Sequence, residues 1–142
     1  MPEPLSLRAR RRLLLLAALA ASAGLILLYR FAPTDDSLYP RCLFHAVTGL
    51  HCPGCGSTRC LHALLHGQVR QAAAYNALAL LALPLLVFWA ARWALAFLRG
   101  VPPRARPLPR WAYVVLIGAV LAFWVLRNLN FPPFDALAPH RL

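Results

Sequence analysis

Three long apolar stretches without a charged residue constrain the fold of this chain more than any other feature. They are bounded by arginines and cover residues 13–29, 71–91 and 111–126. At a rise of about 1.5 Å per residue in an α-helix they measure about 24–32 Å, close to the hydrocarbon thickness of a bilayer. Pro84, inside the second stretch, lacks a backbone donor and is predicted to kink its helix. The sequence therefore predicts an all-α integral membrane protein with a single domain and three transmembrane helices, at about residues 13–30, 72–98 and 111–127.

The amino-acid composition agrees with a lipid environment. Hydrophobic residues make up 61% of the 142 residues and charged residues only 13%, and the mean hydropathy is +0.59. Soluble domains contain roughly 45–50% apolar residues. The lipid bilayer is therefore the expected partner of most of the surface.

The distribution of arginines predicts how the chain is oriented in the membrane. All fifteen basic residues are arginines, against four acidic residues, and the net charge is +11. The arginines gather at the ends of the apolar stretches, so no nucleic-acid partner is expected. They are densest before the first stretch and in residues 99–110, and the positive-inside rule places both groups in the cytoplasm. The N-terminus is then cytoplasmic, and the C-terminus and the loop of about residues 31–71 face outward.

The first apolar stretch has a second interpretation, as a cleaved signal peptide. It follows the basic sequence "RARRR", and "ASA" at residues 21–23 resembles a cleavage site. The apolar run continues beyond that site without a polar break, which favours a transmembrane helix.

The loop of residues 31–71, called the Cys-rich loop below, carries most of the reactive side chains. Its centre is "CPGCGSTRC", residues 52–60. Pro53, Gly54 and Gly56 predict a tight turn, followed by a short interfacial helix with Ser57 or Thr58 as its N-cap. Gly67 is predicted to end that helix.

Four interpretations of the cysteines follow from the sequence. Cys52 and Cys55 are spaced as in zinc knuckles, with Cys42 as third ligand and a fourth from His51, Cys60, His62 or His66. In an oxidising compartment two of the cysteines can instead form a disulfide that closes the loop. A redox pair is a third interpretation, because a helix N-terminus and the nearby Arg59 are expected to lower the pKa of Cys55. In the fourth, the cysteines are reduced, buried side chains around a turn.

The same residues resemble a bacterial family of small membrane proteins known as domain of unknown function 2752. Its pattern is Tyr-Pro-x-Cys, then Thr-Gly-x-x-Cys-Pro-Gly-Cys-Gly-x-Thr-Arg, then Leu-x-x-Gly and an Asn before a long apolar helix. In this chain the matching residues are Tyr39, Pro40, Cys42, Thr48, Gly49, Cys52, Pro53, Gly54, Cys55, Gly56, Thr58, Arg59, Leu64, Gly67 and Asn76, followed by a similar tail at 127–139.

The resemblance implies a membrane protein of the bacterial inner membrane, but it implies no activity. The family usually has a small residue where this chain has Cys60. This difference favours Cys42, Cys52 and Cys55 over Cys60 as the cysteines that bind a metal or form a disulfide.

The leading hypothesis is a non-enzymatic accessory or assembly partner whose Cys-rich loop is stapled by zinc or by a disulfide. Its expected partners are another membrane protein or a second copy of the chain. Arg127 and Asn128, at the end of the third stretch, are predicted to pack against the loop. The alternative hypothesis is a membrane thiol–disulfide oxidoreductase that uses Cys52 and Cys55.

Overall fold

The fold is known from a computed structural model, which describes residues 6–33, 39, 42–101 and 107–129. Within these ranges the regular elements are helices, namely α1 (Leu7–Arg30), α2 (Leu43–Thr48), α3 (Ser57–Leu65), α4 (Val69–Arg99) and α5 (Arg110–Leu126). The described part of the chain is therefore all-α, as predicted. Pro40 and most of the tail that resembles the family lie outside the described residues, as does the predicted outward C-terminus.

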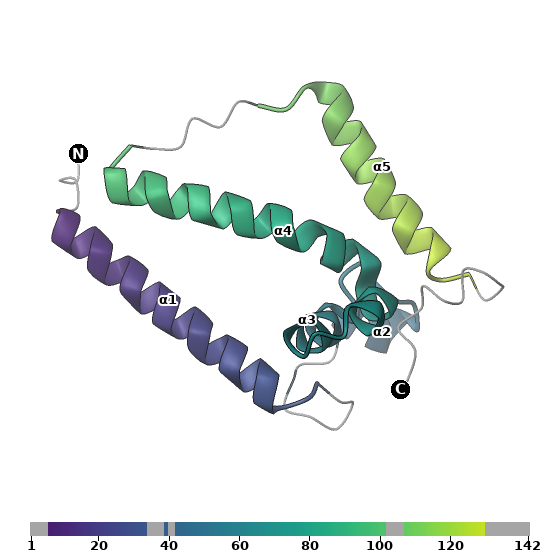
Figure 1. Cartoon of the computed structure of the whole chain (residues 1–142). Coiled ribbons are helices and arrows are strands. Elements are labelled where there is room, and N and C mark those ends of the chain that lie inside the picture. Colours follow the sequence, from purple (N-terminus) through teal and green to yellow (C-terminus); the bar gives the residue numbers. More distant parts are fainter. Residues whose placement is uncertain (1–5, 34–38, 40–41, 102–106, 130–142) are drawn as a thin grey trace.

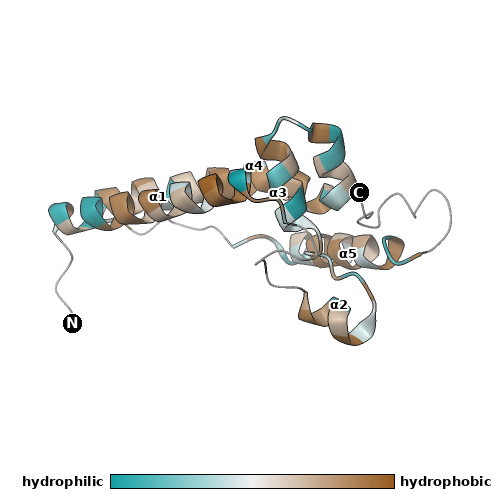
Figure 2. Ribbon diagram, turned by 90° about the horizontal axis from the view of Figure 1, so that it is seen from below, coloured by the Kyte–Doolittle hydropathy of each residue, from teal (hydrophilic) through white to brown (hydrophobic). Residues whose placement is uncertain are grey.

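The helices α1 and α4 are long and apolar enough to cross a membrane. They have 24 and 31 residues, and the apolar segment of each is almost entirely exposed on the protein surface. The helix α5 is also apolar but has 17 residues, which corresponds to about 26 Å. Figure 2 shows much of the α1 and α5 ribbons in brown, the colour of hydrophobic residues, with hydrophilic residues at the start of α1. The predicted transmembrane helices all lie inside these three helices except for Arg127, which follows α5.

The helix α4 is interrupted at Asn76. Asn76 has φ −162° and ψ 94°, an extended conformation between two helical segments. Its Oδ1 accepts a hydrogen bond from the backbone N–H of Ala79 at 2.9 Å. This is the geometry of an N-cap, so Asn76 caps the second segment from within the helix. Pro84 lies in the helical run that follows.

The N-cap of the short helix α3 is a glycine and not the predicted serine or threonine. Gly56 is the N-cap and has φ 79°, which favours glycine because a β-carbon is strained in this region. The predicted end is confirmed, since Gly67 follows the helix with φ 74° and the next N–H, of Gln68, bonds to the carbonyl of Ala63 at 2.9 Å. The small buried core consists of Cys60, Ala63 and Ala72, where α3 packs on α4.

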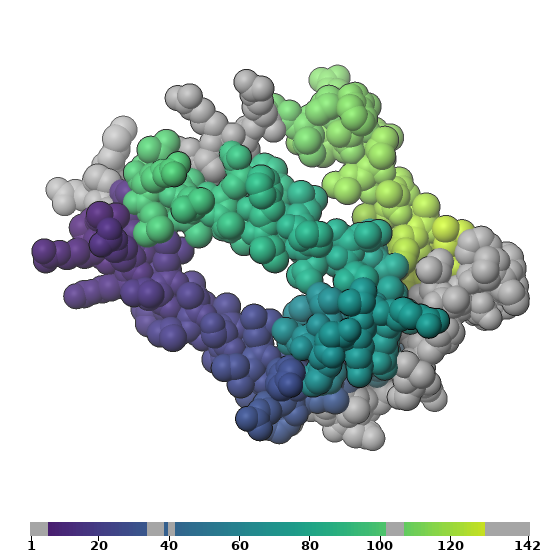
Figure 3. Space-filling view, in the orientation of Figure 1, coloured from purple at the N-terminus to yellow at the C-terminus, as the bar shows by residue number. Residues whose placement is uncertain are grey.

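The helices α4 and α5 diverge from the end of the molecule that holds this core, whereas α1 runs beside α4 and its start lies near the end of α4. The helix α3 packs mainly against α4, and α1 contacts both of them. Figure 1 shows α1, α4 and α5 extending away from α2 and α3. The space-filling view shows open space beside α4 toward α1 and toward α5 (Figure 3). The Cys-rich loop is therefore the place where the described helices meet.

Candidate metal centre

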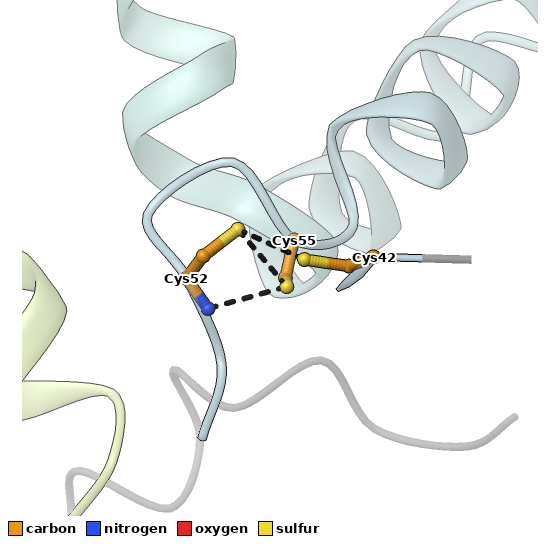
Figure 4. A group of neighbouring side chains, drawn as sticks. All are labelled: Cys42, Cys52 and Cys55. Carbon is orange, nitrogen blue, oxygen red and sulfur yellow. Dashed lines mark hydrogen bonds between the residues drawn. The ribbon is translucent and has the colours of Figure 1, made fainter. Parts of the chain in front are cut away.

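Three cysteines of the Cys-rich loop bring their sulfur atoms together. The sulfurs of Cys42, Cys52 and Cys55 all lie within 4.8 Å of one another. The Cys52 and Cys55 sulfurs are 3.1 Å apart, and those of Cys42 and Cys52 are 3.5 Å apart. Figure 4 shows the three side chains pointing toward a common point. We call these residues the three-cysteine cluster; all of its members are free thiols.

The backbone of residues 52–55, called the CPGC turn below, explains why two of the sulfurs meet. The N–H of Cys55 donates to the carbonyl of Cys52 at 3.1 Å and closes the turn. The N–H of Cys52 donates to the sulfur of Cys55 at 3.2 Å (Figure 4). Cys42 arrives from a separate element, because it is the N-cap residue of α2.

The thiols of the cluster differ in acidity, and the difference contradicts the electrostatic argument for a redox pair. Burial raises the pKa of the Cys55 thiol to about 12, which opposes the thiolate that redox catalysis requires. A hydrogen bond from the backbone N–H of His45 lowers the pKa of Cys42 instead. Arg59 was expected to assist Cys55, but its Nε donates to the carbonyl of Pro33 at 3.0 Å.

Arg127 is the most buried charged side chain among the described residues, and it supports the CPGC turn. It is 1% exposed. One terminal nitrogen donates to the carbonyls of Cys52 at 3.2 Å and Pro53 at 3.4 Å. The other donates to the carbonyls of Cys55 at 3.1 Å and Tyr75 at 3.2 Å. A single planar guanidinium thus joins the turn to α4, and the predicted packing of Arg127 against the loop is confirmed.

Asn76 supports the same turn from the break in α4. Its side chain is 1% exposed. Its Nδ2 donates to the carbonyls of Pro53 at 2.9 Å and Cys55 at 3.1 Å, and to the hydroxyl of Ser57 at 3.1 Å. Buried amides keep such bonds because an unpaired polar group in the interior is costly. The family resemblance pointed to Asn76, but its contacts with the turn were not anticipated.

Asn128 holds the residue that precedes the turn. Its Oδ1 accepts from the N–H of His51 at 2.8 Å, and its Nδ2 donates to the His51 carbonyl at 2.9 Å. The Nδ2 also donates to the carbonyl of Trp124 in α5 at 2.8 Å. The ring of Trp124 meets that of Phe44 edge-on, with 6.1 Å between centroids. The end of α5 is therefore attached both to the turn and to α2.

The four predicted candidates for a fourth ligand lie outside the cluster. The sulfur of Cys60 faces the carbonyl of Asn76 at 3.6 Å. The ring of His51 stacks on that of His45 at 4.4 Å between centroids. Thr58, another residue of the family pattern, is exposed in the first turn of α3.

His62 and His66 use their Nδ1 atoms to contact backbone carbonyls. Nδ1 of His62 lies 2.6 Å from the carbonyl of Leu28, and Nδ1 of His66 lies 2.9 Å from the carbonyl of His62. The ring of His66 also stacks on Tyr29 at 4.3 Å between centroids. These two histidines therefore connect α3 to the end of α1.

The three-cysteine cluster fits a thiophilic metal ion. Zinc binds thiolates at about 2.3 Å, so in a tetrahedral site the sulfurs are about 3.8 Å apart. The observed separations of 3.1 and 3.5 Å need only small side-chain movements to match this value. The cluster can thus supply three ligands to such an ion.

Comparison with known proteins shows that part of the chain is similar to one protein family. Residues 42–90 match the sequence model described as "Protein of unknown function (DUF2752)". No curated protein and no solved structure matches the chain. The matched segment begins at Cys42 and includes α2, the CPGC turn, α3 and most of α4. The segment that carries the whole three-cysteine cluster therefore matches this family model.

Proposed function

We propose that Cys42, Cys52 and Cys55 bind one zinc ion, which staples the Cys-rich loop of an integral membrane protein. The observation that carries this proposal is the convergence of three sulfurs within 4.8 Å from two separate elements. A metal bridges such elements because each thiolate contributes one bond to the same ion, and its binding free energy then stabilises the fold.

The charge of Arg127 supports a divalent ion. Three thiolates and one Zn²⁺ carry a net charge of −1, and the buried guanidinium beside the turn carries +1. A buried charge is costly unless it is paired. A zinc–thiolate centre pairs it, whereas a cluster of neutral thiols does not.

The proposed setting is the bacterial inner membrane, with α1, α4 and α5 as three spans and the Cys-rich loop outward. The apolar surfaces of the three helices and the arginines at the start of α1 support this topology. In this setting the protein acts as a non-enzymatic accessory or assembly partner. The exposed apolar sides of α1, α4 and α5 are available to lipid and to another membrane protein or a second copy of the chain.

The test is a metal and thiol analysis of the protein purified in mild detergent. We expect one zinc per chain, lost in Cys52→Ser and retained in the matched control Cys60→Ser, because Cys60 lies outside the cluster. If the protein contains no metal and two of its cysteines are blocked, the loop is closed by a disulfide and not by zinc. Metal-free protein with four reactive thiols would overturn both kinds of staple.

The orientation needs a separate experiment. An impermeant maleimide applied to intact cells should label metal-depleted protein at Cys42, whose side chain is half-buried. Labelling that appears only after the cells are broken would place the loop in the cytoplasm and contradict the proposed topology.

A further inference from the structure

Five arginines meet at the end of the molecule farthest from the Cys-rich loop. Four of them are in the first turns of α1 and one is the last residue of α4, namely Arg8, Arg10, Arg11, Arg12 and Arg99. We call this set the arginine end. The guanidinium of Arg10 lies directly against Gly100, so the start of α1 and the end of α4 are neighbours. Figures 1 and 3 show the purple start of α1 beside the green end of α4.

The positive charge of this end has no acidic partner in the described part of the chain. Arg8, Arg11, Arg12 and Arg99 are exposed, and the residues that the structure describes contain neither aspartate nor glutamate. The first turn of α1 likewise has no acidic residue. Several cations at one end of two adjacent helices repel one another, and a bound anion relieves that repulsion.

We propose that the arginine end binds the phosphate groups of anionic phospholipids. A guanidinium presents paired N–H donors that match phosphate oxygens, and the chain uses arginine at all of its basic positions. The contact with Gly100 holds Arg10 between the two helices, where a headgroup can reach arginines of both. The inference rests on the proposed membrane setting, which brings this end to the level of the headgroups.

The surroundings favour a lipid over free phosphate. Exposed apolar side chains begin immediately beside the arginines, with Leu13, Leu15 and Leu16 on α1 and Leu95 and Phe97 on α4. A phospholipid satisfies both parts of this surface, because its phosphate meets the guanidinium groups while its acyl chains cover the adjacent leucines. Free phosphate satisfies only the first part.

The opposite ends of the same two helices provide an internal comparison. Arg30 ends α1 and Arg70 lies at the start of α4, so each of these helices has one arginine there. The double variant Arg11→Gln/Arg12→Gln removes two exposed charges from the arginine end. The double variant Arg30→Gln/Arg70→Gln removes the same charge from the other ends of the same helices and is the matched control.

The experiment measures lipid retention by native mass spectrometry after reconstitution in equal amounts of phosphatidylglycerol and phosphatidylcholine. We expect the wild type and the Arg30→Gln/Arg70→Gln control to retain phosphatidylglycerol preferentially. Because an arginine near an anionic surface contributes about five-fold, the Arg11→Gln/Arg12→Gln variant should lose about 25-fold of this preference.

Three results would overturn the inference. Equal retention of the two lipids by the wild type would show that the arginine end does not select anionic headgroups. An equal loss in both double variants would show that net charge, rather than this end, determines the preference. Displacement of the lipid by inorganic phosphate at equal concentration would identify a site for the free anion. Failure to incorporate into either lipid would instead refute the membrane setting, so the two proposals fail separately.

Discussion

Replacing Arg127 with glutamine removes the group that joins the CPGC turn to α4. The guanidinium donates four hydrogen bonds, of 3.1 to 3.4 Å, to the carbonyls of Cys52, Pro53, Cys55 and Tyr75. Hydrogen bonds to a charged group contribute about 1.5–3 kcal/mol each, or about 6–12 kcal/mol for the four. Burying the cation offsets several kcal/mol of this gain, and Asn76 continues to bond two of the carbonyls in the variant. We therefore expect the turn to lose about 3–5 kcal/mol of stability.

The buried thiol of Cys55 reports this loss directly. In chelator-treated protein in detergent, labelling of Cys55 requires the turn to open, so its rate follows the free energy of local opening. A loss of about 3–5 kcal/mol accelerates labelling by about 140- to 3700-fold. Arg127→Lys should give an intermediate rate, because one ammonium cannot reach four carbonyls.

Arg110→Gln is the matched control, since it removes the same charge from the exposed start of α5. Its labelling rate should equal that of the wild type. A rate for Arg127→Gln within about two-fold of the wild type would refute the reasoning, because the turn would then be held without the guanidinium.

Three further predictions concern the turn and its thiols. Asn76→Ala should destabilise the fold by about 2–4 kcal/mol, because it removes the cap to Ala79 and the bonds that Nδ2 donates to the turn; an unchanged unfolding temperature would contradict this. Gly56→Ala should cost about 1–2 kcal/mol because of the left-handed backbone, and thermal unfolding at an unchanged temperature would argue against that conformation. In metal-free protein at about pH 8, iodoacetamide should modify Cys42 before Cys55, since the pKa of Cys42 is lowered and that of Cys55 is raised to about 12; peptide mapping that finds Cys55 modified first would overturn this order.

The helices were largely predictable from the sequence because their signals are local. Uninterrupted apolar runs between arginines gave the three long helices, and the glycines around the motif gave the turn and the end of α3. A kink at Pro84 is a prediction of the sequence, but the interruption of the helical backbone at Asn76 is not. A proline can remain within a helix, whereas a buried asparagine side chain can replace the backbone as hydrogen-bond acceptor and redirect the chain.

The site was predicted only in part because its contacts join distant segments. The pairing of Cys42 with the CPGC turn, and the approach of Arg127 and Asn128, were expected from their positions. The sequence does not predict which carbonyls accept hydrogen bonds from Arg127 and Asn76, because no periodicity indicates which backbone groups a buried side chain will meet. One signal was present: a lone polar residue at the edge of an apolar helix must find a partner, and Asn76 and Arg127 both have this position.

The hydrogen bonds that attach the CPGC turn to α4 and α5 use backbone carbonyls and no sulfur atom. The backbone carbonyls of these residues therefore hold the turn in place, and the sulfur atoms of the cysteines remain available for the metal. A serine, histidine or aspartate at position 52 can present the same carbonyl to Arg127 while it offers a different ligand atom to the centre. The metal ligands can therefore change during evolution while the backbone of the turn stays the same. Relatives that keep Asn76 and Arg127 are expected to share this turn even where they bind a different metal.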